Sequence, residues 1–231
     1  KRLILPGVGN DIVDLSAAET AGKCEDRRFL GKVLTEAEQH VLAAARKAPD
    51  RLLWSFWAAK EAAYKAISQL HESLSAAPRR YAVSIETDPE SLKAGAEAAG
   101  HVQTPSERVR VRIFHHADYL HCIGTTDAGP CLEGLTYDLA PVPRMTPHET
   151  TLPADPSFFV RRMAAEKIAS ILNLAPQNLC ITRRKNTRGL GPPKIYIDDH
   201  PAPFPLSLSH HGRFAGYAVL MPRGDLIFIT Y

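Results

Sequence analysis

Two groups of side chains in the first 65 residues are of the types that bind a cation and phosphate. Asp11 and Asp14 follow the apolar run at the start of the chain, and Glu61 and Lys65 lie four residues apart in WSFWAAKEAAYKAI. That spacing places both side chains on one face of a helix. Magnesium takes one or two carboxylates together with substrate phosphate oxygens. Asp11 and Glu61 would supply such a site if their segments meet, with Lys65 facing the phosphates.

Each group also has an ordinary structural explanation. A Glu and a Lys four residues apart usually form a solvated ion pair, and acids after a strand often cap turns or helices. However, Trp54, Phe56 and Trp57 precede the charged face of the helix. Large aromatic side chains indicate a packed interior or a cleft close by, which favours a site.

A third segment, PLSLSHHGRFAGYAV, predicts a strand, a turn from Ser209 to Gly212, and a returning strand. Histidine in such a turn is often structural. Serine followed by histidine could also indicate a hydrolase. Adjacent residues of an extended chain point to opposite faces, however, which is poor geometry for a nucleophile and its base. We therefore do not expect a hydrolase.

A basic segment, RRKNTRGLGPP, follows the predicted strand NLCITRR and is expected to be a loop. Its charged side chains could simply be solvated. Its glycines and prolines could instead hold exposed backbone against a planar base while the cations meet phosphate. The basic residues of this region are Arg183, Arg184, Lys185, Arg188 and Lys194.

The elements that would carry these residues mix helix and strand. Residues 3–14 are typical of a buried strand that ends in acidic side chains. Thr35 and Glu38 have the pattern of a capping box and predict a helix that runs to about Lys47. Residues 52–70 are rich in alanine and lack Gly and Pro, so a second helix is expected there.

Further along the chain, strands are expected at 81–86 and, as a pair, at 109–126. The segment 140–156 is rich in Pro and Thr and is predicted to be irregular, and 157–174 is predicted to be an amphipathic helix. The apolar side of this helix would consist of Phe158, Met163, Ile168 and Leu172. The same order of helix, strand, loop and strand pair is thus expected in both halves.

Composition narrows the class of protein. The 231 residues are 45% hydrophobic, which is enough to bury a core in one large domain or two compact halves. A net charge of +3 is too small to indicate a nucleic-acid-binding protein. The four cysteines lack metal-site spacing, and the apolar start is too short for a signal peptide or membrane span. We therefore expect a cytoplasmic protein that binds neither nucleic acid nor membrane.

Three segments together are more specific than any one alone, namely GVGNDIVDL, WSFWAAKEAAYKA and PLSLSHHGRFAGYAV. Together they resemble the 4'-phosphopantetheinyl transferase superfamily. The first half resembles a holo-acyl-carrier-protein synthase protomer, and residues 157–220 are similar to the N-terminal half of the longer surfactin-synthetase-type enzymes. Because the S-H half comes first in those enzymes, the two halves here would be in permuted order.

The resemblance implies an α+β fold of two similar halves, 1–130 and 131–231, which form a pseudo-two-fold dimer within one chain. Coenzyme A would lie between the halves, with one site per monomer. The implied reaction moves the 4'-phosphopantetheine group from coenzyme A to a serine of an apo-acyl or peptidyl carrier protein and uses Mg2+. Two alternatives remain, an inactive module of the same fold that binds coenzyme A or carrier protein, and a metal-dependent phosphohydrolase.

The resemblance also assigns roles to single residues. Asp11 and Glu61 match the magnesium ligands, and with Lys65 they would be the catalytic residues. Lys65, Ser209 and His210 match contacts to the phosphates of coenzyme A, and Gly191 and Pro193 match the loop beside the adenine. Lys60 is a further candidate contact, and the candidates for the 3'-phosphate are Arg161, Arg162 and Arg183. In the first half, Phe114 and His115 replace the Ser-His pair, which implies a decayed second site. Val13 and Pro192 stand where the longer enzymes often have an acidic ligand and a lysine.

Overall fold

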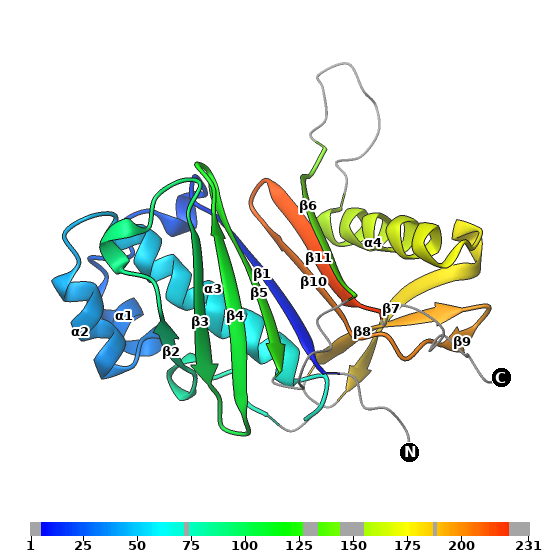
Figure 1. Ribbon diagram of the computed structural model, residues 1–231, viewed down its shortest axis with the longest axis horizontal. Coiled ribbons are helices and arrows are strands. Elements are labelled where there is room, and N and C mark those ends of the chain that lie inside the picture. Colours follow the sequence, from blue (N-terminus) through cyan, green and yellow to red (C-terminus); the bar gives the residue numbers. More distant parts are fainter. Residues whose placement is uncertain (1–5, 72–73, 127–133, 144–154, 187–188, 222–231) are drawn as a thin grey trace.

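The structure, a computed structural model, describes residues 6–71, 74–126, 134–143, 155–186 and 189–221. These residues contain four α-helices and eleven strands, and all the strand pairs are antiparallel. Figure 1 shows the elements up to β5 on one side and those from β6 onward on the other, with β1 and β10 adjacent between them. This mixture agrees with the expected α+β class. The expected boundary at residue 130 lies outside the described residues.

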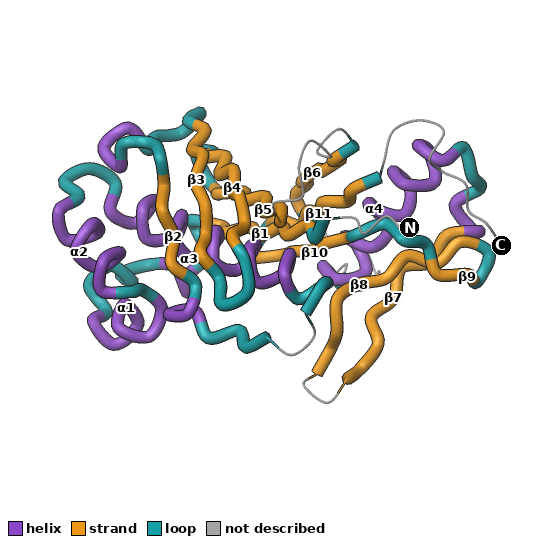
Figure 2. Tube along the Cα trace, turned by 60° about the horizontal axis from the view of Figure 1, so that its bottom comes forward, coloured by secondary structure: helices purple, strands orange, loops and turns teal. Residues whose placement is uncertain are grey.

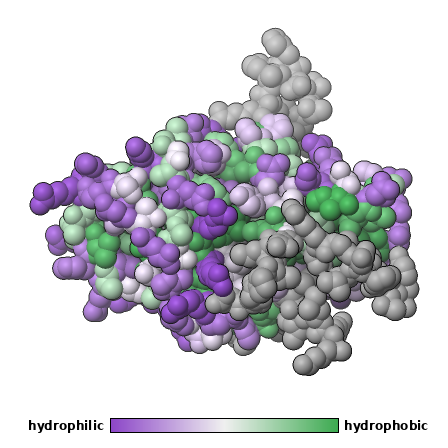
Figure 3. Space-filling model, in the orientation of Figure 1, coloured by the Kyte–Doolittle hydropathy of each residue, from purple (hydrophilic) through white to green (hydrophobic). Residues whose placement is uncertain are grey.

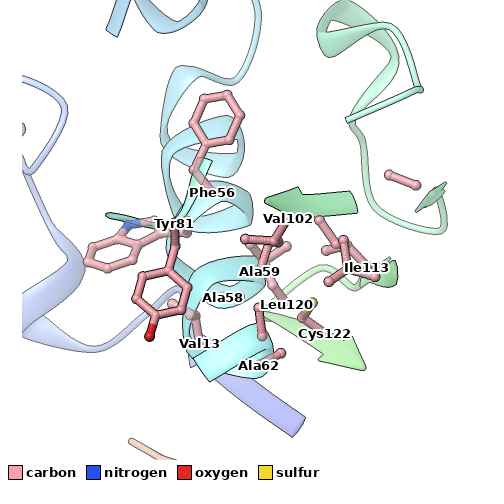
Figure 4. Close-up of a cluster of buried hydrophobic side chains, with 14 of the residues drawn as sticks. Val13, Phe56, Ala58, Ala59, Ala62, Tyr81, Val102, Ile113, Leu120 and Cys122 are labelled. Carbon is pink, nitrogen blue, oxygen red and sulfur yellow. The ribbon is translucent and has the colours of Figure 1, made fainter. Parts of the chain in front are cut away.

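The first sheet has five strands in the order β1-β5-β4-β3-β2. Its strands are β1 (Val8–Asp14), β2 (Ala82–Ile85), β3 (Glu97–Gln103), β4 (Arg108–His115) and β5 (Tyr119–Thr126). The helices of this part are α1 (Arg27–Val33), α2 (Glu36–Ala44) and α3 (Pro49–Ile67). Helix α3 covers one face of the sheet. Figure 4 shows side chains from both layers, among them Phe56, Val102 and Leu120, in the core between them.

The sequence of α3 explains its close approach to the sheet. Pro49 occupies the first turn, where no intrahelical partner for an N–H is lost. Alanines such as Ala58 and Ala62 are fully buried and form the face toward the sheet. Gly9 of β1 faces this surface, and a Cβ added to it would collide with the carbonyl of Ala62. The small residues therefore bring β1 and α3 close enough for Asp11 to meet side chains of the helix.

The later strands form two three-stranded sheets in the orders β10-β11-β6 and β7-β8-β9. These strands are β6 (Leu135–Pro141), β7 (Leu179–Asn186), β8 (Gly189–Ile197), β9 (His200–Pro201), β10 (Leu206–His211) and β11 (Phe214–Leu220). Helix α4 (Pro156–Leu172) packs against β7, β10 and β11 around a second buried cluster that includes Ile168, Ile195 and Tyr217. Figure 2 shows the β7–β8 hairpin extending away from the rest of this side.

Strand β1 joins the two parts. Its second face contacts β10 and β11. The buried Asn10 donates from Nδ2 to the carbonyl of Gly216 (2.7 Å) and bonds His121 Nε2 through Oδ1 (2.7 Å). Gln69, just beyond α3, donates to the carbonyls of Val8 (2.7 Å) and Leu206 (2.8 Å). These contacts fix β10 beside β1.

Several predicted elements are confirmed. The capping box of Thr35 and Glu38 is present, with Glu38 Oε2 2.8 Å from the Thr35 amide, although α2 ends at Ala44. The second helix is confirmed as Pro49–Ile67, and the paired strands at 109–126 are β4 and β5.

Other predictions are wrong or incomplete. The basic segment expected as a loop belongs mainly to the β7–β8 hairpin, where Arg183 donates to the carbonyls of Gly191 (2.7 Å) and Leu190 (3.0 Å). Strand β3 was not expected. Helix α4 buries Phe159 and Val160, whereas Phe158 is 60% exposed. Most of the predicted irregular segment, 144–154, lies outside the described residues.

In the described part of the chain, no helix has both the length and the apolarity needed to span a membrane. Figure 3 shows one face of the molecule, where hydrophilic residues cover much of the side formed by α1, α2 and β2 to β4. An apolar area appears on this face on the side of α4. Phe158 and Ile171 are the large apolar residues of α4 that are exposed.

Candidate active site

A pocket of about 450 Å³ opens where α3 and β1 meet β8, β10 and the first turns of α4. Its size is that of a small-molecule site. It draws side chains from every segment that the sequence singled out. The predicted site residues that line it are Asp11, Glu61, Lys65, Arg161, Arg183, Gly191, Pro193, Ser209 and His210.

Asp11, Lys65 and Ser209 form the polar centre of the pocket. Lys65 Nζ lies 2.7 Å from Asp11 Oδ1 and 3.2 Å from Ser209 Oγ, and it also donates to the carbonyl of Asn10 (3.0 Å). Ser209 Oγ donates to Asp11 Oδ1 (3.2 Å). Three segments far apart in the sequence therefore supply one hydrogen-bonded group.

Glu61 lies one helical turn before Lys65 and faces the same pocket. Burial raises the pKa of its carboxyl to about 7; the charge of Asp11 adds to this rise and that of Lys65 opposes it. Two carboxylates that repel each other in one pocket are suited to a hard cation that also takes phosphate oxygens. Within the described residues, no group of three or more His, Cys, Asp or Glu side chains forms a metal site. Asp11 and Glu61 would therefore need substrate oxygens to complete one.

Basic groups line the other side of the pocket. Burial lowers the pKa of Arg183, and the nearby charge of Arg161 lowers it further. The Arg183 guanidinium is held by carbonyls of β8, which fixes its position at the pocket wall. Partial burial also lowers the pKa of His210, with a further contribution from Lys65. The pocket can thus offer several positive or neutral donors to an anionic ligand.

Two residues predicted to contact coenzyme A do not line the pocket. Lys60 is only 2% exposed, and its Nζ lies 2.7 Å from Glu38 Oε2 in the core beneath α2. It follows Ala59 on α3 and precedes Glu61, so its side chain leaves the helix in another direction. Arg162 is exposed, pairs with Glu166 (3.7 Å) and lies over the ring of Phe159. We therefore leave Lys60 and Arg162 out of the ligand set.

Sequence reasoning missed two interactions that build the site. The sequence indicates only that Gln69 belongs to a helix, whereas its side-chain amide bridges β1 and β10. Arg213 was noted only as part of a motif, although it forms an ion pair with Asp14 (2.8 Å). For Arg213 the available signal was an aspartate at the end of an apolar strand, but these two residues lie 199 positions apart. The second Ser-His position is not in the pocket, since His115 is buried in the first core.

A family match includes part of this site. The family model described as the 4'-phosphopantetheinyl transferase superfamily matches residues 7–123, more than half of the chain. The match contains Asp11, Glu61 and Lys65. No curated protein matches the chain. Because this match covers more than half of the chain, the chain belongs to the 4'-phosphopantetheinyl transferase superfamily.

Proposed function

We propose that this protein transfers the 4'-phosphopantetheine group of coenzyme A to a serine of an apo-acyl or peptidyl carrier protein. The observation that carries the proposal is the meeting of Asp11, Glu61 and Lys65 with Ser209 and His210 in one pocket. The family match covers only the first three of these residues. Hydrogen bonds between Ser209, Asp11 and Lys65 connect them to the segment outside the match.

We further propose that the two parts of the chain, 1–130 and 131–231, are similar halves related by a pseudo-two-fold axis and joined in permuted order. In support, α3 packs on β1, β5 and β4, and α4 packs on β11 and β10 of the second part. Strand β6 pairs with β11 as β1 pairs with β5. One chain would then hold one complete site and act as a monomer.

Asp11 and Glu61 are the residues that would hold Mg2+, because their carboxylates line one pocket and their charges repel. Magnesium bound there would offset negative charge on the pyrophosphate of coenzyme A. Lys65, Arg161, Arg183 and His210 would bind and orient the phosphates from the remaining walls. Gly191 and Pro193 would border the adenine.

The carrier serine oxygen would attack the phosphorus next to pantetheine, and the bond from that phosphorus to the oxygen of 3',5'-ADP would break. Glu61 would take the serine proton as general base, since its carboxylate lines the pocket beside the groups that would bind the phosphates. Lys65 would donate to the oxygen that leaves with 3',5'-ADP. Ser209 would act as a donor within the site, because its hydroxyl already bonds to Asp11.

We also propose that the enzyme is cytoplasmic and that its carrier protein is acidic. A net charge of +3 suits a carrier protein of opposite charge, which electrostatic steering would favour. The alternative of the same fold is an inactive module that binds coenzyme A or carrier protein. Val13 and Pro192, in place of an acid and a lysine, are the observations that favour this alternative.

Intact mass of apo-carrier proteins after incubation with this protein, coenzyme A and magnesium tests the reaction. A gain of about 340 Da, one transferred phosphopantetheine group, is expected with magnesium and not after its removal by chelation. Asp11→Asn serves as the control for the site. Coenzyme A binding without any mass gain on several carriers would support the inactive module, and release of phosphate without an acceptor would support a hydrolase.

A further inference from the structure

Asp14 and Arg213 form an ion pair that neither the proposed metal site nor the proposed phosphate contacts use. Asp14 ends β1, and its side chain is 2% exposed. Arg213 donates to it from Nη2 to Oδ1 (2.8 Å), from Nε to Oδ2 (2.9 Å) and from its backbone N–H to Oδ2 (2.9 Å). Such a bidentate arrangement fixes orientation as well as distance.

The turn that carries Arg213 is shaped around this carboxylate. Gly212 has a φ of +54°, and a Cβ on it would collide with the Asp14 side chain. The Asp14 backbone N–H donates to His211 Nδ1 (3.0 Å), while His211 Nε2 lies 3.4 Å from Glu19 Oε1. The end of β1 therefore holds the β10–β11 turn by side-chain and backbone contacts together.

The pair lies at one end of the contact between β1 and β10. At the other end, Gln69 bonds the carbonyls of Val8 in β1 and Leu206 in β10. Between these two attachments lies the hydrogen bond from Ser209 to Asp11. Asp11 and Ser209 come from different strands of different sheets, so their approach depends on how these two strands are fixed to each other.

We propose that Asp14 and Arg213 are positioning residues, which hold Ser209 and His210 of β10 against Asp11 and Lys65 for the transfer reaction. The inference rests on the proposed function. Ser16 also contacts the pair, since its Oγ accepts from Arg213 Nη2 (3.0 Å) and its N–H donates to Asp14 Oδ1 (3.0 Å), while Asp118 and His211 lie nearby. None of these groups offers a second bidentate contact. A displacement of about 1 Å in reacting groups is enough to reduce a rate by a large factor.

Asp14→Asn and Arg213→Lys test the pair, because the first keeps the shape of the side chain and the second keeps the charge. Each is expected to lower kcat by about 10-fold to 100-fold, with the KM for the carrier protein within two-fold of wild type. The double variant should lose little more than the worse single variant, as residues that act as one unit do. Arg112→Lys, in the exposed pair of Arg112 and Glu97 on the first sheet, is the matched control and should leave kcat unchanged.

Hydrogen exchange of the unliganded protein separates this inference from the proposed function. Faster exchange of the β10 amides, residues 206–211, is expected in Asp14→Asn and Arg213→Lys but not in Arg112→Lys. If wild-type protein transfers nothing to any carrier, the proposed function fails, and unchanged exchange would overturn the positioning role separately. A kcat within two-fold of wild type in both folded variants would also overturn it, whatever the loss in Tm. If Asp14→Asn does not fold, Arg213→Lys decides.

Discussion

Lys60 and Lys65 lie on the same helix and have the same side chain, but their surroundings give them different roles. Lys60 is buried and pairs with Glu38, and it also donates to backbone carbonyls of Pro78 and Tyr81. Burial lowers the pKa of Lys60, and its ion pair with Glu38 opposes that change. Lys65 faces the pocket and pairs with Asp11. Stability and function should therefore separate cleanly between the two.

Lys60→Ala should destabilise the fold by about 3 to 5 kcal/mol, because it leaves the buried Glu38 carboxylate without its cationic partner. Lys65→Ala should cost far less stability, since its side chain is partly exposed, but it should abolish most transfer activity. Thermal unfolding and transfer rates of both variants provide the measurement. Normal stability of Lys60→Ala would contradict the structural role assigned to this lysine.

Glu61→Gln should lower the transfer rate by about 100-fold or more, because the amide cannot take a proton from the carrier serine. The same change should not lower Tm in the absence of metal. The raised pKa of the Glu61 carboxyl means that its ionised form is disfavoured in the folded state, and glutamine removes this charge. Rates and Tm are to be compared with Glu166→Gln, an exposed glutamate on α4. Activity within a few-fold of wild type would exclude Glu61 as the base.

At the scale of elements, the close contact between β1 and α3 depends on a glycine in β1. Gly9→Ala should destabilise the protein by about 2 to 4 kcal/mol, since the added Cβ meets rigid backbone of Ala62. Gly31→Ala is the control, because that glycine lies within α1 and a Cβ there has no neighbour within 4 Å. The control should be neutral or stabilising by about 0.5 to 1 kcal/mol. Chemical denaturation measures both; equal effects would show that β1 can move away from the helix.

Elements with a strong local sequence pattern were predictable, and those with a weak or interrupted pattern were not. Thr35 and Glu38 satisfy each other within one turn, so the start of α2 could be read directly. Strand β3 is an alternating strand of small and polar residues, and only its pairing with β2 and β4 defines it. The basic segment after Ile181 contains glycine and prolines, which hid a hairpin that Arg183 holds from across the strands.

The candidate site shows the same division. Glu61 and Lys65 could be proposed because they lie four residues apart on one helix, and Asp11 because it lies in the acidic end of an apolar run. That Lys60 turns into the core could not be proposed, because its partner Glu38 belongs to another helix. The attachment of β10 to β1 through Gln69 and Arg213 was likewise hidden, since each bond joins residues distant in the sequence.

For the whole molecule, two buried histidines lower stability in acid. His115 is 1% exposed, and neither of its ring nitrogens has a hydrogen-bond partner among the described residues. His121 lies where the two parts of the chain meet. Burial lowers the pKa of each from 6.5 to about 4. Since the unfolded chain protonates these histidines below pH 6.5 and the folded one does so only near pH 4, the stability that they contribute is complete above pH 6.5 and falls as the pH drops toward 4. Glu61 acts in the opposite direction, because its pKa is raised to about 7 in the folded state.

His115→Leu should remove part of this loss, because leucine fills the space without a group to protonate. Between pH 7 and pH 4, protonation of this histidine should lower the free energy of unfolding of the wild type by up to about 3 kcal/mol. The variant should not lose this contribution. Urea unfolding at several pH values measures the difference. His40→Gln, on the exposed side of α2, is the control and should follow the wild type. If His115→Leu follows it too, the acid response comes instead from His121, which would place the weak point at the junction that holds the site together.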